Sequence, residues 1–131
     1  MNAILTKPAV FIIEDNDSLI DIFTQAMKVA GFEIETAANG VEAFDKLANM
    51  KPDVIILDLY LPGISGDKIL AYIRNDPRLQ DAKIILTTFD SLLADKFRDQ
   101  CDYVLLKPVS FSQLRDLGIR LRASFSQQEE L

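Results

Sequence analysis

The chain contains five short runs of apolar, mostly β-branched residues, each separated from the next by a longer segment with helical spacing. The runs cover residues 9–13, 33–37, 54–57, 83–87 and 103–106. Several of them are continuously apolar, whereas a strand with one face in water alternates apolar and polar side chains. Strands that are covered on both faces and joined by helices form a parallel sheet. The pattern therefore predicts an α/β domain.

Five segments between and after these runs carry apolar residues three and four positions apart, which is typical of amphipathic helices. The first contains Phe23 and Met27 and is expected to end at Gly31, because glycine readily adopts the left-handed backbone that terminates a helix. The second and third helices are expected to end before Pro52 and Pro77. Right-handed crossovers then predict a flavodoxin-like doubly wound (βα)5 fold, with parallel strands in the order 2-1-3-4-5 and helices on both faces.

Composition excludes several kinds of catalytic site. Histidine is absent, and cysteine occurs once, as Cys101. Ser-His-Asp catalysis, Cys-His catalysis and histidine-ligated zinc are therefore excluded, and a single thiol can neither form an internal disulfide nor make a zinc site. We expect Cys101 to be a small apolar filler in a reducing compartment.

Length, charge and the lengths of the apolar runs indicate the number of domains and the kinds of partner. Residues 8–125 are predicted to form one domain, and residues 126–131 a solvated tail. The formal net charge of −6 argues against direct binding of nucleic acid. The longest apolar runs are far shorter than the ~20 residues of a membrane helix. We therefore expect a cytoplasmic protein with no membrane partner.

Charged and hydroxyl side chains follow four of the predicted strands. Glu14 and Asp15 follow the first, Asp58 follows the third, Thr87 ends the fourth, and Lys107 follows the fifth. In this fold class the site lies beyond the carboxyl ends of the strands, near the switch between strands 1 and 3. Three carboxylates that converge there repel one another unless a cation is present, and Mg²⁺ is the most plausible one. With a lysine and a hydroxyl nearby, the pattern predicts a site for a phosphoryl group attached to an aspartate.

These residues and their surroundings resemble the receiver domain of two-component response regulators. The resemblance covers residues 8–125. Each segment alone is a weak signal, but four in order, each closing a predicted strand, are highly specific. The matching segments are VFIIEDND at 10–17, PDVIILDLYLPGISG at 52–66, IILTT at 84–88 and DYVLLKP at 102–108.

The resemblance implies a Mg²⁺ site built mainly from carboxylates. Asp58 would be both the phosphoacceptor and a metal ligand, and Asp15 a direct ligand. Glu14 would act mainly through a metal-bound water, and the backbone carbonyl of Tyr60 would supply a further ligand.

Three further positions match residues that handle the phosphoryl group in this family. Thr87 matches the hydroxyl that moves onto the phosphoryl group, and Lys107 matches the lysine that pairs with one of its oxygens. Pro108 matches a proline that is usually preceded by a cis peptide bond. One position departs from the family: the switch aromatic usually found three residues before the lysine is Val104 here. Tyr103 is offset by one residue, and it should point to the opposite face of the strand.

The function implied is that of a phosphorylation-controlled signalling module. A histidine kinase or histidine phosphotransfer protein would supply the phosphoryl group, and an output domain or downstream protein would bind the face made by the fourth helix, fifth strand and fifth helix. The protein would not be an enzyme beyond its own phosphorylation and dephosphorylation at Asp58.

Three alternative functions use the same fold. A degenerate receiver would bind partners without phosphorylation, although Asp15, Asp58 and Lys107 are intact. An aspartyl-phosphate phosphatase of the haloacid dehalogenase type needs a second aspartate two positions after the nucleophile, where this chain has Tyr60. A flavodoxin needs a phosphate loop rich in glycine and hydroxyl groups, and the segment EDNDS at 14–18 carries acids instead.

Overall fold

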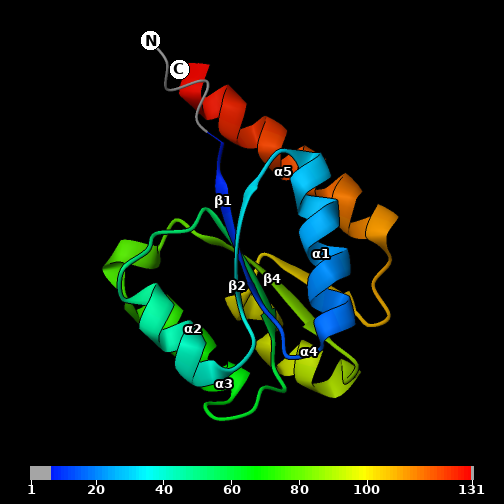
Figure 1. The fold of residues 1–131 in the computed structure, drawn as a ribbon. Coiled ribbons are helices and arrows are strands. Elements are labelled where there is room, and N and C mark those ends of the chain that lie inside the picture. Colours follow the sequence, from blue (N-terminus) through cyan, green and yellow to red (C-terminus); the bar gives the residue numbers. More distant parts are fainter. Residues whose placement is uncertain (1–6, 131) are drawn as a thin grey trace.

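The computed structural model of the protein describes residues 7–130, with 126–130 described by their backbone alone. Its sheet has five parallel strands in the order β2-β1-β3-β4-β5, and helices cover both faces, so the predicted doubly wound fold is confirmed (Figure 1). The strands are β1 (Ala9–Ile13), β2 (Glu33–Ala37), β3 (Val54–Asp58), β4 (Lys83–Thr88) and β5 (Tyr103–Leu106). The helices are α1 (Asp17–Ala30), α2 (Gly40–Leu47), α3 (Gly66–Asn75), α4 (Ser91–Phe97) and α5 (Phe111–Glu130), with short 3₁₀ turns η2 (Pro77–Leu79) and η3 (Arg98–Gln100).

Local sequence signals set the helix ends. Helix α1 begins after Asn16, whose side chain accepts a hydrogen bond from the Leu19 amide, as a good N-cap does. It ends at Gly31, which has the predicted left-handed backbone with φ of 101°. Helix α4 begins after Asp90, whose carboxylate caps the amides of Leu92 and Leu93.

Two apolar layers form the core, one on each face of the sheet. Alternate residues of the central strands point to opposite faces, so Ile55 and Leu57 belong to one layer, and Val54 and Ile56 to the other. Helices α2, α3 and α4 cover the first layer, and helices α1 and α5 cover the second. All four of these side chains are fully buried, as expected for continuously apolar strands.

Helix α5 is longer than the sequence analysis expected. Its backbone runs to Glu130, through residues 126–130 of the predicted tail. The absence of glycine and proline from 119–130 explains this, because no residue there breaks a helix. No helix within residues 7–130 combines the length and the apolar character needed to cross a bilayer.

Strand β5 lies at the edge of the sheet, and its residues alternate between the two faces as predicted. Val104 packs with the layer under α3 and α4, whereas Leu105 packs with the layer under α5. Tyr103 is partly exposed and lies on the side opposite Val104. Nearby, burial raises the pKa of the Cys101 thiol to about 11, so it stays protonated and unreactive at neutral pH.

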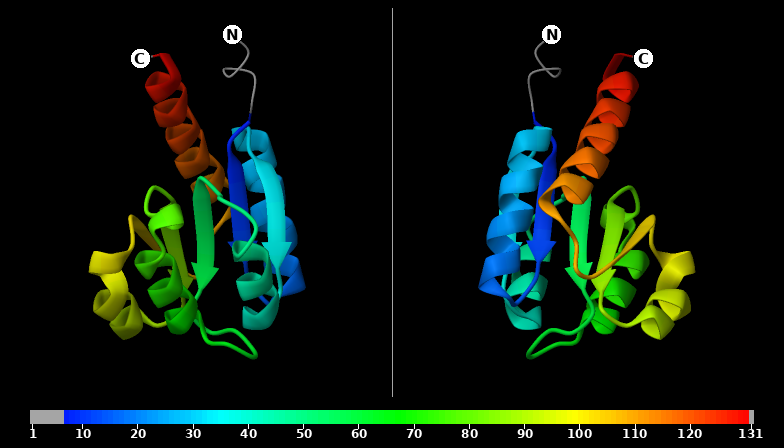
Figure 2. Two further views of the ribbon diagram at one scale, coloured as in Figure 1. Left: turned by 90° about the vertical axis from the view of Figure 1, so that its left-hand side faces the viewer. Right: turned by 90° about the vertical axis from the view of Figure 1, so that its right-hand side faces the viewer.

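The carboxyl ends of all five strands point to one end of the molecule. In Figure 2 the arrowheads lie at the lower end, away from the start of β1 and the end of α5. Asp58 and Thr87 are direct neighbours in the register of β3 and β4. The loops that follow β1, β3, β4 and β5 therefore meet at this end.

Candidate functional site

Three carboxylates meet where β1 and β3 end. Glu14 and Asp15 belong to the loop after β1, and Asp58 is the last residue of β3. Each offers one oxygen atom, and these oxygens all lie within 4.8 Å of one another. Glu14 and Asp58 are buried, whereas Asp15 is exposed to solvent. The cluster thus has two buried acids and one exposed acid.

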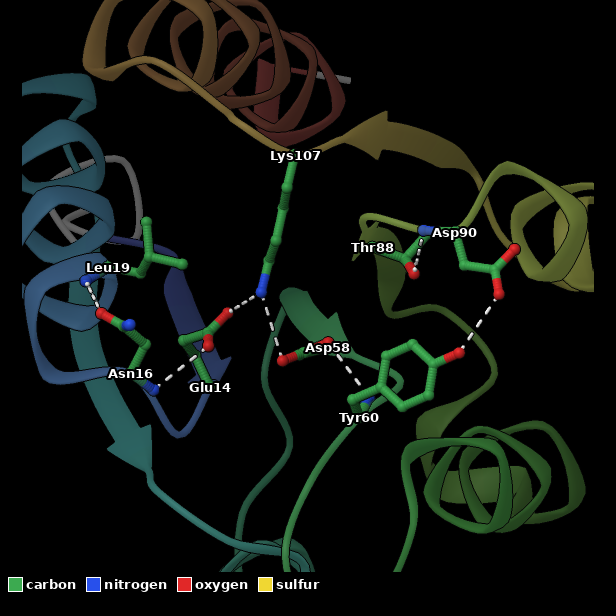
Figure 3. A network of polar contacts seen from close by, with 8 residues as sticks. All are labelled: Glu14, Asn16, Leu19, Asp58, Tyr60, Thr88, Asp90 and Lys107. Carbon is green, nitrogen blue, oxygen red and sulfur yellow. Dashed lines mark hydrogen bonds and ion pairs between the residues drawn. The ribbon is translucent and has the colours of Figure 1, made fainter.

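Lys107 reaches into this cluster from the end of β5 (Figure 3). Its Nζ atom lies 2.8 Å from Glu14 Oε1 and 3.2 Å from Asp58 Oδ2, and its side chain is 4% exposed. The peptide bond between Lys107 and Pro108 is cis, as the sequence resemblance implied. One buried ammonium group therefore compensates two buried carboxylates from different strands.

The burial of these groups shifts their proton affinities. Burial raises the pKa of the Glu14 carboxyl, and the neighbouring charge of Asp58 adds to the rise, although the hydrogen bond from Lys107 opposes it. Burial alone would lower the pKa of Lys107. The hydrogen bond to Glu14 and the negative charges of Asp58 and Glu14 outweigh that effect, and the pKa of the ammonium group is raised. Lys107 therefore carries a permanent positive charge at neutral pH.

Thr87 places an unused hydroxyl beside Asp58. Its side chain is fully buried, and its Oγ1 atom has no hydrogen-bond partner within residues 7–125. Leaving a buried hydroxyl unpaired costs on the order of 1–3 kcal/mol. A folded protein rarely accepts this cost without a reason, and a ligand that takes up the hydrogen bond supplies one.

Tyr60 contacts Asp58 through its backbone. The Tyr60 amide donates a hydrogen bond to Asp58 Oδ1 over 3.1 Å, which holds the carboxylate in place (Figure 3). The Tyr60 carbonyl, expected from the sequence as a metal ligand, belongs to the same turn. The structure thus brings all six of the predicted site residues to one end of the sheet.

Two residues that follow β4 also lie at the site: Phe89, expected from the sequence to flank the path of water to the aspartyl phosphate, and Asp90, which the sequence analysis did not assign. The ring of Phe89 lies 5.3 Å from Lys107 Nζ, within the range of a cation–π contact. Asp90 accepts a hydrogen bond from the Tyr60 hydroxyl over 3.2 Å. Asp90 directly precedes a run that begins a helix, and this N-cap pattern is the signal that could have placed it.

The donor set fits a small divalent cation such as Mg²⁺. Oxygen ligands, two of them buried, are what hard cations prefer, and the partly open side leaves room for water or a phosphoryl oxygen. Three carboxyl groups face the single ammonium group of Lys107, so negative charge is in excess there even with Lys107 present. A cation bound at this position would relieve that excess.

Magnesium is accordingly expected to raise the melting temperature of the protein. Because ligands that bind only the folded state stabilise it by mass action, saturating Mg²⁺ should raise the midpoint by roughly 5 °C or more in a thermal melt. Asp15→Asn should lose most of that rise, while the metal-free variant stays at least as stable as the metal-free parent. If Asp15→Asn keeps the full Mg²⁺-dependent rise in melting temperature, Asp15 is not a metal ligand.

Comparisons with known proteins agree on one family. The model of the response regulator receiver domain matches residues 10–117. The polar-differentiation response regulator DivK of Brucella anthropi is 30% identical over 105 residues, which cover 78% of this chain and 85% of that protein. The DivK protein of Brucella ovis is 29% identical over 109 residues, which cover 81% of this chain and 88% of that protein.

A solved structure supports the same relationship. The chemotaxis response regulator CheY4 of Vibrio cholerae superposes with a TM-score of 0.80 at 25% sequence identity, and the match covers 88% of this chain and 99% of that chain. The two structures share the five-stranded parallel sheet of this fold.

Proposed function

The chain belongs to the response regulator receiver family, and from this premise we propose that it is the phosphoacceptor module of a two-component phosphorelay. Asp58 carries the phosphoryl group in this proposal. The observation that supports it most is the buried contact of Asp58 with Lys107, next to the unpartnered Thr87 hydroxyl. In a purely structural cluster, an unpaired buried hydroxyl at this point would destabilise the fold without serving any ligand.

The phosphoryl transfer itself needs little from the protein beyond position and charge. An oxygen of Asp58 attacks the phosphorus atom of a donor phosphohistidine, a bond from oxygen to phosphorus forms, and the bond from phosphorus to the donor nitrogen breaks. The donor is a histidine kinase or a histidine phosphotransfer protein, because this chain has no histidine. Lys107 stabilises the negative charge on the transferred group, and Thr87 donates its free hydroxyl to a phosphoryl oxygen.

A Mg²⁺ ion would supply further positive charge on the phosphoryl oxygens. Asp15, Asp58 and the Tyr60 carbonyl would hold it directly, and Glu14 would hold it through a water molecule. The chemistry of the chain is then limited to the gain and loss of one phosphoryl group at Asp58, which makes it a switch and not a metabolic enzyme. The intact Asp58 and Lys107 argue against a degenerate receiver.

The proposal is tested by chemical phosphorylation. Acetyl phosphate with Mg²⁺ should add one phosphoryl group to the protein, measured by intact-mass analysis. Asp58→Asn should abolish the addition, because an amide oxygen is a poor nucleophile. Asp45→Asn, at an exposed position of α2, removes the same charge elsewhere and should leave the addition unchanged. Labelling that persists in Asp58→Asn would refute the assignment.

Phosphorylation of Asp58 would change the surface of the domain, and an output domain or a downstream protein in the cytoplasm would bind the changed surface. We propose that this partner binds the face formed by α4, β5 and α5, where Leu92, Leu106 and Ile119 are exposed apolar side chains. Neither nucleic acid nor a membrane is a direct partner in this proposal.

Tyr103 and Thr87 are expected to differ in their effect on that partner. Since Tyr103 lies on the side of β5 opposite the switch position, Tyr103→Ala should leave phosphorylation-dependent binding within about twofold of the parent. Thr87→Ala should abolish most of the dependence on phosphorylation, because it removes the free hydroxyl. The affinity of the partner for both forms of each variant measures this. The reverse pattern would show that the signal passes through Tyr103.

A further inference from the structure

A hydrogen bond between two side chains crosses the mouth of the site. The Tyr60 hydroxyl donates to Asp90 Oδ2 over 3.2 Å, and Figure 3 shows the tyrosine ring extending from Asp58 toward Asp90. Tyr60 lies in the loop between β3 and α3, and Asp90 in the loop between β4 and α4. This hydrogen bond therefore links the β3–α3 loop to the β4–α4 loop, which are separated in the sequence by α3 and β4.

Asp90 also fixes the beginning of α4. Its Oδ1 atom accepts hydrogen bonds from the amides of Leu92 and Leu93 over 2.9 and 3.2 Å. Its own amide donates to Thr88 Oγ1 over 3.1 Å. Any force on the Asp90 carboxylate is thus transmitted to the first turn of α4 and to the end of β4.

Tyr60 is equally tied to the phosphoacceptor, because its amide donates to Asp58 Oδ1. A continuous path of hydrogen bonds therefore runs from Asp58 through Tyr60 and Asp90 to α4. This path does not involve position 104, where the side chain is valine and packs among apolar neighbours.

The same loop makes a second contact over the site. Phe89 stands between Thr88 and Asp90, is 71% exposed, and places its ring 5.3 Å from Lys107 Nζ. Thr87 lies two residues earlier and has a free buried hydroxyl. If that hydroxyl moves to a phosphoryl oxygen, the loop that follows must move with it, and the present contacts of Phe89 and Asp90 belong to its position before that movement.

We propose that the hydrogen bond between Tyr60 and Asp90 is a latch that favours the unphosphorylated position of the β4–α4 loop. This proposal rests on the proposed phosphorylation of Asp58. A contact made in only one of two states shifts the equilibrium toward that state and weakens every ligand that binds the other. The latch therefore sets how readily the β4–α4 loop adopts its position in the phosphorylated protein. Tyr60 acts as a positioning residue for Asp90.

Two single variants remove the latch from opposite sides. Tyr60→Phe keeps the ring and the backbone contacts and loses only the hydroxyl. Asp90→Ser keeps a good N-cap for α4, but serine is too short to cap the helix and reach Tyr60 at once. Tyr103→Phe is the matched control, since it removes a hydroxyl from a partly exposed tyrosine on β5.

The first measurement is the affinity for beryllofluoride, a mimic of the phosphoryl group, in the presence of Mg²⁺. Tyr60→Phe and Asp90→Ser should each tighten binding about two- to tenfold, as expected for the loss of one hydrogen bond from the unliganded state. The double variant should bind no more tightly than the stronger single variant, because both changes break the same bond. Unchanged or weaker binding of beryllofluoride by Tyr60→Phe would overturn the latch. The latch would also be overturned if the gain in affinity of the double variant equalled the product of the two single gains.

The second measurement needs neither Mg²⁺ nor beryllofluoride. Amide hydrogen exchange at Leu92 and Leu93 should be at least twofold faster in Tyr60→Phe than in the Tyr103→Phe control, because Asp90 is held less firmly. Equal exchange rates would overturn the latch. Failure of the unaltered protein to bind beryllofluoride would instead overturn the proposed function, so the two failures are distinguishable.

Discussion

Gly66→Ala is expected to lower the free energy of unfolding by about 3 kcal/mol, because the added methyl group meets backbone atoms in a closely packed contact. A methyl group at Gly66 would overlap the carbonyl oxygen of Asp58 and lie 2.5 Å from the Cα atom of Leu59. Both neighbours are backbone atoms, so no side-chain rotation relieves the overlap. The first turn of α3 has to move away from the end of β3.

The same change should disturb the site, because the carbonyl oxygen that the methyl group meets belongs to Asp58. We expect phosphorylation by acetyl phosphate to slow at least tenfold in the variant protein that remains folded, since a misplaced nucleophile loses its alignment. Urea unfolding measures the first effect and intact-mass analysis the second.

Gly118→Ala is the control for this prediction. A methyl group there lies 2.8 Å from Ala30 Cβ and 3.0 Å from Met27 Sδ, which are side-chain atoms between α1 and α5. The contact with Ala30 Cβ requires a small shift between α1 and α5, but Met27 can change its rotamer, and alanine inside a helix is favoured over glycine by about 1 kcal/mol, which offsets part of the cost. Gly118→Ala should therefore cost clearly less than Gly66→Ala. If the two variants lose the same free energy of unfolding, the contact with the Asp58 backbone does not explain the destabilisation by Gly66→Ala.

The fold was predictable from the sequence because local and long-range signals agree. The β-branched runs, the helix end at Gly31, and the alternation within β5 all point to the same arrangement. The convergence of Glu14 and Asp58 follows in turn, because the carboxyl ends of neighbouring parallel strands meet at one edge. This part of the site needed only the positions of the strand ends.

Side-chain direction was not predictable in the same way. Lys107 has a long, flexible side chain, and no pattern in the sequence says that it pairs with Glu14, 93 positions away. Exposed aromatic side chains such as Tyr60 and Phe89 have little packing to fix them, so their contacts with Asp90 and Lys107 appear only in three dimensions. The positions of these residues in the fold follow from the strand ends, but their contact partners depend on side-chain rotamers.

The phosphorylated protein is expected to lose its phosphoryl group slowly, over many minutes or longer, because two aromatic side chains flank the site. Tyr60 is two residues after Asp58, and Phe89 is two residues after Thr87. Both rings are more than half exposed, but neither points away from the mouth: one reaches Asp90, and the other lies against Lys107. Rings in these places cover the approach to the aspartyl phosphate, and Phe89 offers no hydrogen bond to orient a water molecule.

The hydrolysis rate of the phosphorylated protein tests this shielding. Tyr60→Asn with Phe89→Glu introduces an amide and a carboxylate that can position water, and a gain of one such hydrogen bond is worth about 1–3 kcal/mol of barrier. The double variant should therefore hydrolyse about ten- to hundredfold faster in excess Mg²⁺. Tyr60→Phe with Phe89→Leu makes both positions apolar, provides no group that can position water, and should stay within about threefold of the parent. If the polar double variant hydrolyses no faster than this apolar control, the rings do not limit access of water, and the lifetime of the signal is set elsewhere.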